Sequence, residues 1–297
     1  MLLCSEGKIL SIITAIFQAI GQALTFIFPI SESGHSAIFH NFAARNSGGV
    51  SELTGLIHIG IAIGIIIAFY KVFIRNFVEF VNSFKEIFSK DLKVRRASNS
   101  RRFVYFLLIS FVPMLLYLIP AGKKGNVYHF LNMLSYDGNL LSEGIAFLVT
   151  ATLLLFASLT MMKNQENRGN QLSLPIVILL AVSVFAALPV SGLSLSATII
   201  SVAVLCNINK NIAFRYFISI SVPILVVKGI IEIIVCASYV TIITGIVAVV
   251  FSAAAAYFAS KLFKAVVSNR YLKYFSYYNY AIGAIAVVTG IVQFIIK

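Results

Sequence analysis

The strongest constraint on the fold is a series of apolar runs, each long enough for a helix to cross the hydrocarbon core of a bilayer, which takes about 20 residues. Six runs come close to this length: 52–75, 103–120, 143–162, 217–237, 239–262 and 278–296. Only 11% of the residues are charged, against roughly 25% in a soluble domain. The sequence therefore predicts an all-α polytopic membrane protein with six transmembrane helices.

Two further apolar regions, 8–45 and 173–206, are each interrupted by a polar stretch. The first stretch is "FPISESGH", residues 28–35, and the second is "LPVSGLSLSAT", residues 188–198. Irregular backbone at membrane depth is tolerated only where protein or a water-filled cavity surrounds it. Each region is therefore predicted to form a re-entrant helical hairpin, in which two short helices meet at a polar turn.

The hairpin followed by three runs occurs twice along the chain. Because three spans is an odd number, the second half is inverted relative to the first. The prediction is a single integral membrane domain over 1–297, with inverted halves of about 1–162 and 163–297. Inverted halves with broken helices place a binding site near the midplane, between the two halves. The two polar turns are thus expected to approach each other in the core.

The net charge of +13 is concentrated between two apolar runs. Nine Lys and Arg lie between Lys71 and Arg102, against three acids, which gives this segment alone a charge of +6. Such a cluster is typical of a cytoplasmic loop that follows the positive-inside rule. It excludes nucleic acid as the partner and favours contact with anionic lipid headgroups. The segment 121–142 is then expected outside the cell.

The first polar stretch contains the side chains most suited to chemistry. Ser31, Glu32, Ser33 and His35 follow one another closely, and Gln22 lies on the preceding helix. An ionisable group at membrane depth is costly and is usually functional. The alternative is that this turn reaches the interface, where Glu32 and His35 are simply solvated. His58, in an apolar run, is interpreted as a hydrogen-bonded core histidine.

The second polar stretch is rich in small and hydroxyl residues, among them Gly192, Ser194 and Ser196. Such a turn can present N–H groups and hydroxyls to an anion at the start of the next helix. Close helix packing explains small residues equally well. Lys228 and Glu232, four residues apart in one run, are interpreted as a structural ion pair.

Both polar stretches resemble those of the undecaprenyl-diphosphatase family of bacitracin-resistance membrane phosphatases. "QALTFIFPISESGH" is similar to that family's E-G-L-T-E-F-L-P-[IV]-S-S-[ST]-G-H, and "PVSGLSLSAT" is similar to P-G-x-S-R-S-G-A-T. "LTGLIHIGIAIGIIIAFYKVF", "ISFVPMLLYLIP", "NKNIAFRYFISISVPILV" and "YFSYYNYAIGAIAVV" resemble later family segments in the same order. The resemblance implies a multi-pass protein of the bacterial plasma membrane that hydrolyses a polyprenyl diphosphate to the monophosphate during recycling of the cell-wall lipid carrier.

The chain departs from this family pattern at charged positions. The two family glutamates fall at Gln22 and Phe26, the arginine of the second motif falls at Leu195, and a further arginine falls at Asn279. A motif serine is replaced by Glu32. Arg45 or Arg215 is expected to take over the cationic role.

Two functions follow from the resemblance. In the first, the chain is a divergent phosphatase that acts on a polyprenyl diphosphate lipid, with a divalent metal, Mg²⁺ or Ca²⁺, held by Glu32. The roles implied are catalytic for His35, Glu32 and Ser31, and substrate-binding for the remaining motif residues, which are Gln22, Ser33, Gly34, Gly192, Ser194 and Ser196. In the second, the same scaffold binds or moves an isoprenoid phosphate without catalysis. The pattern leaves a homodimer open.

Overall fold

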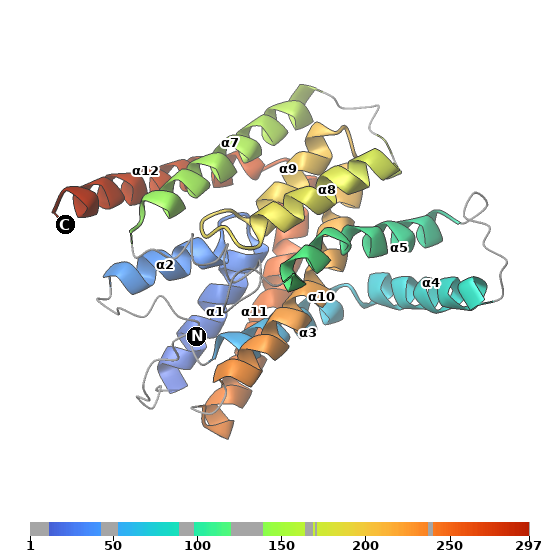
Figure 1. Cartoon of the computed structure of the whole chain (residues 1–297), viewed down its shortest axis with the longest axis horizontal. Helices are drawn as coiled ribbons and strands as arrows, with labels where there is room; N and C mark the ends of the chain where they lie inside the picture. The colour runs from blue at the N-terminus through green and yellow to red at the C-terminus, as the bar shows by residue number, and fades with distance from the viewer. Residues whose placement is uncertain are drawn as a thin grey trace.

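The computed structural model describes residues 12–42, 53–88, 98–119, 139–163, 169, 171–236 and 240–296. Within them all elements are helical (Figure 1). The helices are α1 (Ile12–Ile27), α2 (Glu32–Phe42), α3 (Thr54–Ala68), α4 (Tyr70–Phe88), α5 (Asn99–Ser110), the 3-10 helix η2 (Pro113–Leu118), α7 (Leu141–Lys163), α8 (Leu174–Ala187), α9 (Leu195–Leu205), α10 (Lys210–Cys236), α11 (Ile242–Ser268) and α12 (Leu272–Ile296).

Five segments in the described part of the chain are long and apolar enough to cross a membrane: α5 continued through η2, α7, α10, α11 and α12. They coincide with five of the six predicted spans, although α10, α11 and α12 begin or end several residues beyond the apolar runs. The chain is therefore a helical, polytopic membrane protein.

The sixth predicted span, 52–75, is wrong as a continuous helix. The chain breaks at Phe69, and α4 leaves α3 at an angle of 94°. In α4, exposed apolar side chains such as Ile74 and Phe77 share the helix with Lys71 and Arg75. A helix with this amphipathic pattern is suited to the interface rather than the hydrocarbon core. The segment 71–102, predicted as a loop, is therefore helical up to Phe88 and again from Asn99, where α5 begins.

Small residues allow the central helices to pack closely. The buried side chains of α1 include Ala15, Ala19 and Ala23, spaced four apart on the side that packs against α11. On α3, a Cβ added to Gly60 would overlap Ser252 of α11 at 2.0 Å. Such close backbone approach is the usual basis of helix association in membranes. It brings α1, α3 and α11 side by side (Figure 1).

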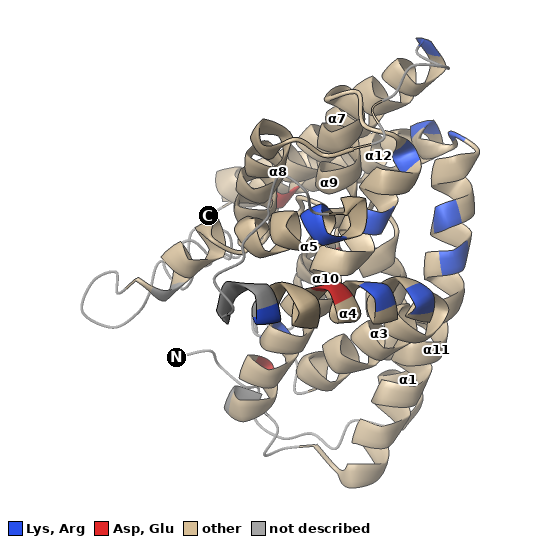
Figure 2. Ribbon diagram, turned by 90° about the vertical axis from the view of Figure 1, so that its right-hand side faces the viewer, with Lys and Arg blue, Asp and Glu red and all other residues tan. Residues whose placement is uncertain are grey.

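Basic side chains gather on the part of the molecule formed by α4, α5 and the C-terminal part of α11 (Figure 2). Lys261 and Lys264 of α11 hold their ammonium groups 4.9 and 5.7 Å from the ring centre of Phe69, at the α3–α4 break. The basic end of α11 therefore lies next to the start of the basic segment 71–102.

Candidate functional site at the meeting of two polar turns

The first polar turn joins α1 to α2 through a residue with left-handed backbone. Ser31 has a φ of 60°, which is uncommon for a residue other than glycine. Its hydroxyl accepts a hydrogen bond from the backbone N–H of Gly34 at 3.3 Å and lies 3.4 Å from the Ser33 hydroxyl. This geometry caps the start of α2 and holds Ser31 buried inside the bundle.

The second polar turn joins α8 to α9 and is built in a similar way. Gly192 has a φ of 91°, a conformation that favours glycine. The Ser194 hydroxyl caps α9 by accepting from the N–H of Ala197 at 3.4 Å, and it lies 3.2 Å from the Ser196 hydroxyl. Thr150 of α7 braces the turn, because its hydroxyl donates to the Gly192 carbonyl and accepts from the Ser194 N–H.

The two turns meet, as the sequence predicts. The Ser196 hydroxyl donates to the Phe28 carbonyl at 3.1 Å. Gly34 lies directly on Gly192, so that a Cβ added to Gly34 would come within 2.7 Å of the Gly192 Cα and 2.6 Å of the Phe147 ring. Predicted residues from both stretches therefore share one buried region: Ser31, Ser33, Gly34, Gly192, Ser194 and Ser196.

Gly34→Ala is expected to destabilise the protein by about 1–3 kcal/mol, because the added methyl group has no room between two backbones. Gly21→Ala is the matched control, since a Cβ at Gly21 meets nothing within 4 Å. That change should be neutral or stabilise α1 by up to about 1 kcal/mol. Thermal unfolding of both variants in detergent measures the difference. Equal unfolding temperatures would show that the turns are not in close contact.

His35 faces an aromatic wall beside the first turn. Its Nδ1 donates to the Ser31 carbonyl at 2.8 Å, and its Nε2 lies 2.7 Å from the hydroxyl of Tyr278 on α12. The imidazole stacks on the Tyr278 ring with 5.7 Å between centres and meets Phe147 edge-on at 5.3 Å. Tyr278 is thus a partner of His35 that sequence reasoning missed.

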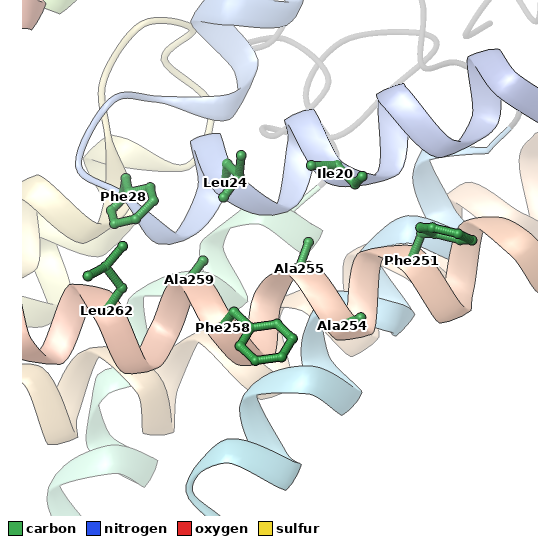
Figure 3. A pocket seen from close by; sticks show the side chains of 9 residues that line it. All are labelled: Ile20, Leu24, Phe28, Phe251, Ala254, Ala255, Phe258, Ala259 and Leu262. Carbon is green, nitrogen blue, oxygen red and sulfur yellow. The ribbon is translucent and has the colours of Figure 1, made fainter.

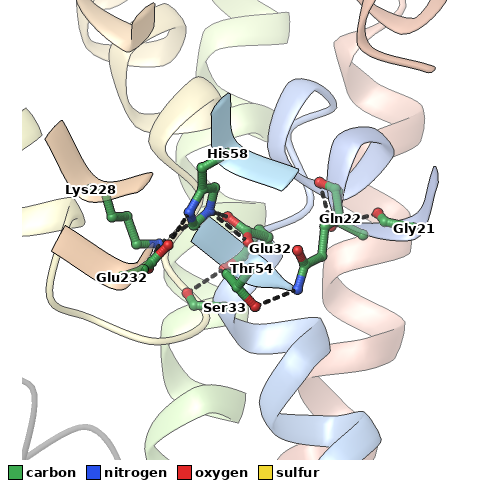
Figure 4. Close-up of polar contacts among 10 residues, drawn as sticks. Gly21, Gln22, Glu32, Ser33, Thr54, His58, Lys228 and Glu232 are labelled. Atoms are coloured by element: carbon green, nitrogen blue, oxygen red, sulfur yellow. Dashed lines mark hydrogen bonds and ion pairs between the residues drawn. The ribbon is translucent and has the colours of Figure 1, made fainter. Parts of the chain in front are cut away.

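Glu32 points into a different group of side chains, shown in Figure 4. Its two carboxylate oxygens lie 3.0 and 3.2 Å from Nε2 of His58 on α3. The opposite ring nitrogen, Nδ1, lies 2.5 Å from the carboxylate of Glu232 on α10. The Lys228 ammonium completes the cluster, at 3.8 Å from Glu232 and 3.5 Å from His58 Nε2.

This charged cluster of Glu32, His58, Lys228 and Glu232 is buried among apolar helices. The His58 side chain is fully buried, and those of Glu32 and Glu232 are 11% and 7% exposed. Lys228 is the most open member, at 35%. Charged groups at such depth persist only when they are paired, and they mark functional pathways in membrane proteins. His58 is thus a buried, hydrogen-bonded histidine, as predicted, but its partners are charged, and Lys228 and Glu232 are not an isolated pair.

Sequence comparison agrees with this architecture. Residues 15–285 match the family described as bacitracin resistance protein BacA. The chain belongs to the BacA family. Its curated relatives include proteins named undecaprenyl-diphosphatase from Halothermothrix orenii, 25% identical over 94% of this chain and 98% of the relative, and from Methanosphaera stadtmanae, 25% identical over 95% and 99%. A relative of the same name from Korarchaeum cryptofilum is 27% identical over 92% and 97%.

Membership of the BacA family and the apolar spans confirm the predicted localisation, a multi-pass bacterial membrane protein. The family's curated relatives carry the name of a phosphatase, which supports hydrolase function at the level of the family.

Positions at which this BacA-family chain lacks the expected charges lie close to the turns. Asn279 donates to the Pro29 carbonyl at 2.8 Å and so holds the first turn, while no described residue donates a hydrogen bond to its buried Oδ1. Leu195 opens α9 directly after the second turn. Phe26 packs against Phe217, with 6.5 Å between ring centres. Apolar packing and an amide thus occupy the three positions at which the resemblance implies charged groups.

Gln22 does not join the charged cluster. Its amide nitrogen donates to the Thr54 hydroxyl at 3.3 Å, at the start of α3, and its buried Oε1 has no hydrogen-bond partner in the part of the chain that the structure describes. The polar side chain therefore lies between α1 and α3, where it can still accept a hydrogen bond.

Arg215 is not the replacement cation that the sequence suggested. Its guanidinium donates to Asn76 at 3.0 Å and lies 4.0 Å over the Phe103 ring. Along α10 it is 13 residues from Lys228, a distance of about 20 Å. Arg45 lies outside the described residues. Lys228 is instead the cation that the fold brings to Glu32, through His58.

The divalent metal expected at Glu32 stays a prediction. No group of three His, Cys, Asp or Glu in the described ranges is arranged to hold an ion. Glu32 and Glu232 contact opposite nitrogens of the His58 ring, so an ion at Glu32 would be bound by this carboxylate together with phosphate oxygens of a substrate. Glu143 is a further buried carboxylate that sequence reasoning missed. Its backbone carbonyl lies against Gly192, and it accepts from the Ser142 hydroxyl.

Proposed function

We propose that this chain is a polyprenyl-diphosphate phosphatase whose head-group site lies where the two polar turns meet. The observation that carries the proposal is the chain of hydrogen bonds from Glu32, in the first motif, through His58 to Glu232. A buried carboxylate–imidazole–carboxylate arrangement is suited to taking up and passing on a proton. The names of the curated relatives supply the substrate class, a polyprenyl diphosphate.

The proposed reaction uses water as the nucleophile. The water oxygen attacks the terminal phosphorus, and the bond from that phosphorus to the bridging oxygen breaks. The products are the polyprenyl monophosphate and inorganic phosphate. The proton lost by the water passes to Glu32, whose oxygens have lone pairs left after bonding His58. His58 and Glu232 then hold the added proton inside the bundle.

The other residues have binding roles in this proposal. Lys228, the most exposed member of the charged cluster, neutralises diphosphate charge in place of the arginine absent at Leu195. The hydroxyl groups of Ser33, Ser194 and Ser196 and the first N–H groups of α9 face the head group. The buried Ser191 hydroxyl, which has no hydrogen-bond partner among the described residues, is a further donor. His35 positions the first turn through Ser31 and is itself oriented by Tyr278.

We also infer that α1–α2 and α8–α9 are re-entrant hairpins in inverted halves of about 1–162 and 163–297. The support is geometric. The longest of these four helices has 16 residues, or about 24 Å, which is less than the roughly 30 Å of a bilayer core. The contacts between the two halves also correspond. Helix α1 of the first half packs against α11 of the second, and α8 of the second half packs against α5 of the first.

The basic and apolar faces of α4 support contact with anionic lipids.

The test is phosphate release from undecaprenyl diphosphate by the purified protein, with and without added Mg²⁺. Release above that of a mock purification is expected. Undecaprenyl monophosphate serves as the control substrate, because hydrolysis of a monophosphate would indicate a different specificity. If the folded protein binds the lipid but releases no phosphate under any of these conditions, the phosphatase proposal fails. The same scaffold would then be a non-catalytic binding or transport protein.

A further inference from the structure

Two arginines come together at the junction of α4, α5 and α10. The Arg215 guanidinium, on α10, donates to the side-chain carbonyl of Asn76 on α4 at 3.0 Å and lies 4.0 Å over the ring of Phe103 on α5. Arg75 precedes Asn76 on α4 and is near enough for its positive charge to act on that of Arg215. The fold therefore places two like charges close to each other, which is unfavourable unless an anion neutralises them.

No acidic side chain in the described ranges supplies that anion. Neither Arg75 nor Arg215 forms an ion pair with a described Asp or Glu. The nearest acid along α4 is Glu79, one turn after Arg75, and its carboxylate already accepts hydrogen bonds from Arg101 and Ser98. The charge of the two arginines is thus left for a ligand to balance.

The guanidinium of Arg215 is held in place and still has donors to offer. Asn76, its hydrogen-bond acceptor, is itself fixed to α10, because its amide donates to the Ser219 hydroxyl at 3.0 Å. A guanidinium carries five N–H donors, and the buried Nε of Arg215 has no hydrogen-bond partner among the described residues. A fixed, planar group with free donors matches the geometry of a phosphate, whose oxygens accept two parallel hydrogen bonds.

We propose that Arg75 and Arg215 bind one phosphate group, either on an anionic lipid head or as free inorganic phosphate. The site narrows the lipid contact proposed above for α4 as a whole to two residues, and it rests on the interfacial position of that helix. The depth is suitable, since Arg215 lies five residues, or about 8 Å, from the start of α10.

This phosphate site is separate from the head-group site and from the apolar groove. Arg215 is about 20 Å along α10 from Lys228, the cation of the charged cluster. The groove between α1 and α11, shown in Figure 3, is lined by apolar side chains from Ile20 to Leu262 and gives an anion no polar side chain to bind.

Native mass spectrometry of the protein in detergent tests the site, because each bound lipid adds its own mass. Phosphatidic acid is the probe, and phosphatidylcholine, whose head group has no net charge, is the control lipid. We expect Arg75→Gln and Arg215→Gln each to raise the dissociation constant of the first phosphatidic acid about tenfold. Lys71→Gln removes the same charge from an exposed position one turn earlier on α4 and should change it less than twofold.

The double variant Arg75→Gln with Arg215→Gln shows whether one phosphate is shared. If both arginines hold the same group, the combined loss of affinity is smaller than the product of the two single losses. Inorganic phosphate is tested separately, through the unfolding temperature that it adds to wild type and to Arg75→Gln. Stabilisation of wild type alone by inorganic phosphate would identify free phosphate as the ligand, and arginine-dependent binding of phosphatidic acid alone would identify a lipid.

Three results would overturn the inference. They are equal weakening by Lys71→Gln and Arg75→Gln, a double variant whose loss equals the product of the single losses, and no difference between wild type and the arginine variants with either ligand. Arg75 is exposed, so Arg75→Gln keeps the test valid even if Arg215→Gln fails to fold. Because the readouts are binding and stability, failure of the phosphatase proposal would leave this inference standing.

Discussion

Glu32→Gln is expected to lower phosphate release from undecaprenyl diphosphate by about a hundredfold or more, the usual effect of losing an acid–base group. The amide keeps the size of the side chain and can still accept a hydrogen bond from His58, but it cannot take a proton from water. Initial rates of release by wild type and variant, at matched protein concentration in the same detergent, measure the effect.

Glu79→Gln is the matched control for this change. Glu79 is also a paired carboxylate, bonded to Arg101 at 3.1 Å, but it joins α4 to α5 away from the polar turns. Its replacement should leave the rate within about twofold of wild type, because its carboxylate bonds Arg101 and Ser98 and neither polar turn. Release by Glu32→Gln at the wild-type rate would remove Glu32 from the chemistry.

His58→Leu is expected to destabilise the protein by about 3–5 kcal/mol, because it leaves buried carboxylates without their partner. Leucine fills much of the space of the imidazole, but Glu32 loses both of its hydrogen bonds and Glu232 loses its closest one. Thermal unfolding in detergent should show this as a large drop in the transition temperature.

The double variant His58→Leu with Glu232→Leu distinguishes unpaired charge from simple loss of packing. It removes one of the two carboxylates and leaves Glu32 with Lys228, so stability should return in part. If the double variant is less stable than the single one, packing at the α3–α10 contact dominates instead. If His58→Leu unfolds at the wild-type temperature, the imidazole does not hold the charged cluster together.

The polar turns and their contact could be predicted from sequence because the signal there is local. Pro29, Ser31 and Gly34 interrupt one apolar run, and Gly192 and Ser194 interrupt another, so each break is visible within a few residues. The long spans could be predicted for the same reason, since about 20 apolar residues leave few alternatives to a transmembrane helix.

The charged cluster could not be predicted in the same way. His58 and Glu232 are 174 positions apart, and His58 stands among apolar neighbours that suggest a core residue. Lys228 and Glu232 are four residues apart on one helix, a spacing that explains an ion pair without reference to any other helix. Only the packing of α3 against α10 shows that these three residues meet Glu32.

The bend at Phe69 was hidden by composition. Residues 54–68 are almost entirely apolar, and Tyr70, Val72 and Phe73 continue the apolar run into α4. A count of hydropathy over 52–75 cannot distinguish a straight span from a span followed by an amphipathic helix. The two structures differ in the spacing of the polar residues that they require after Phe69. Lys71 and Arg75 are four positions apart, which is the spacing of one face of an amphipathic helix.

The early end of α3 also affects the surrounding bilayer. Its 15 residues extend about 22 Å, several ångströms less than the roughly 30 Å of hydrocarbon that most bilayers present. Lipids next to a short hydrophobic segment respond to such hydrophobic mismatch by thinning. The membrane beside α3 is therefore expected to be locally thin. His58, four residues from the start of this helix and so about 6 Å along its axis, then lies about 5 Å from the middle of the helix, and local thinning shortens the path from its charged cluster to the headgroups.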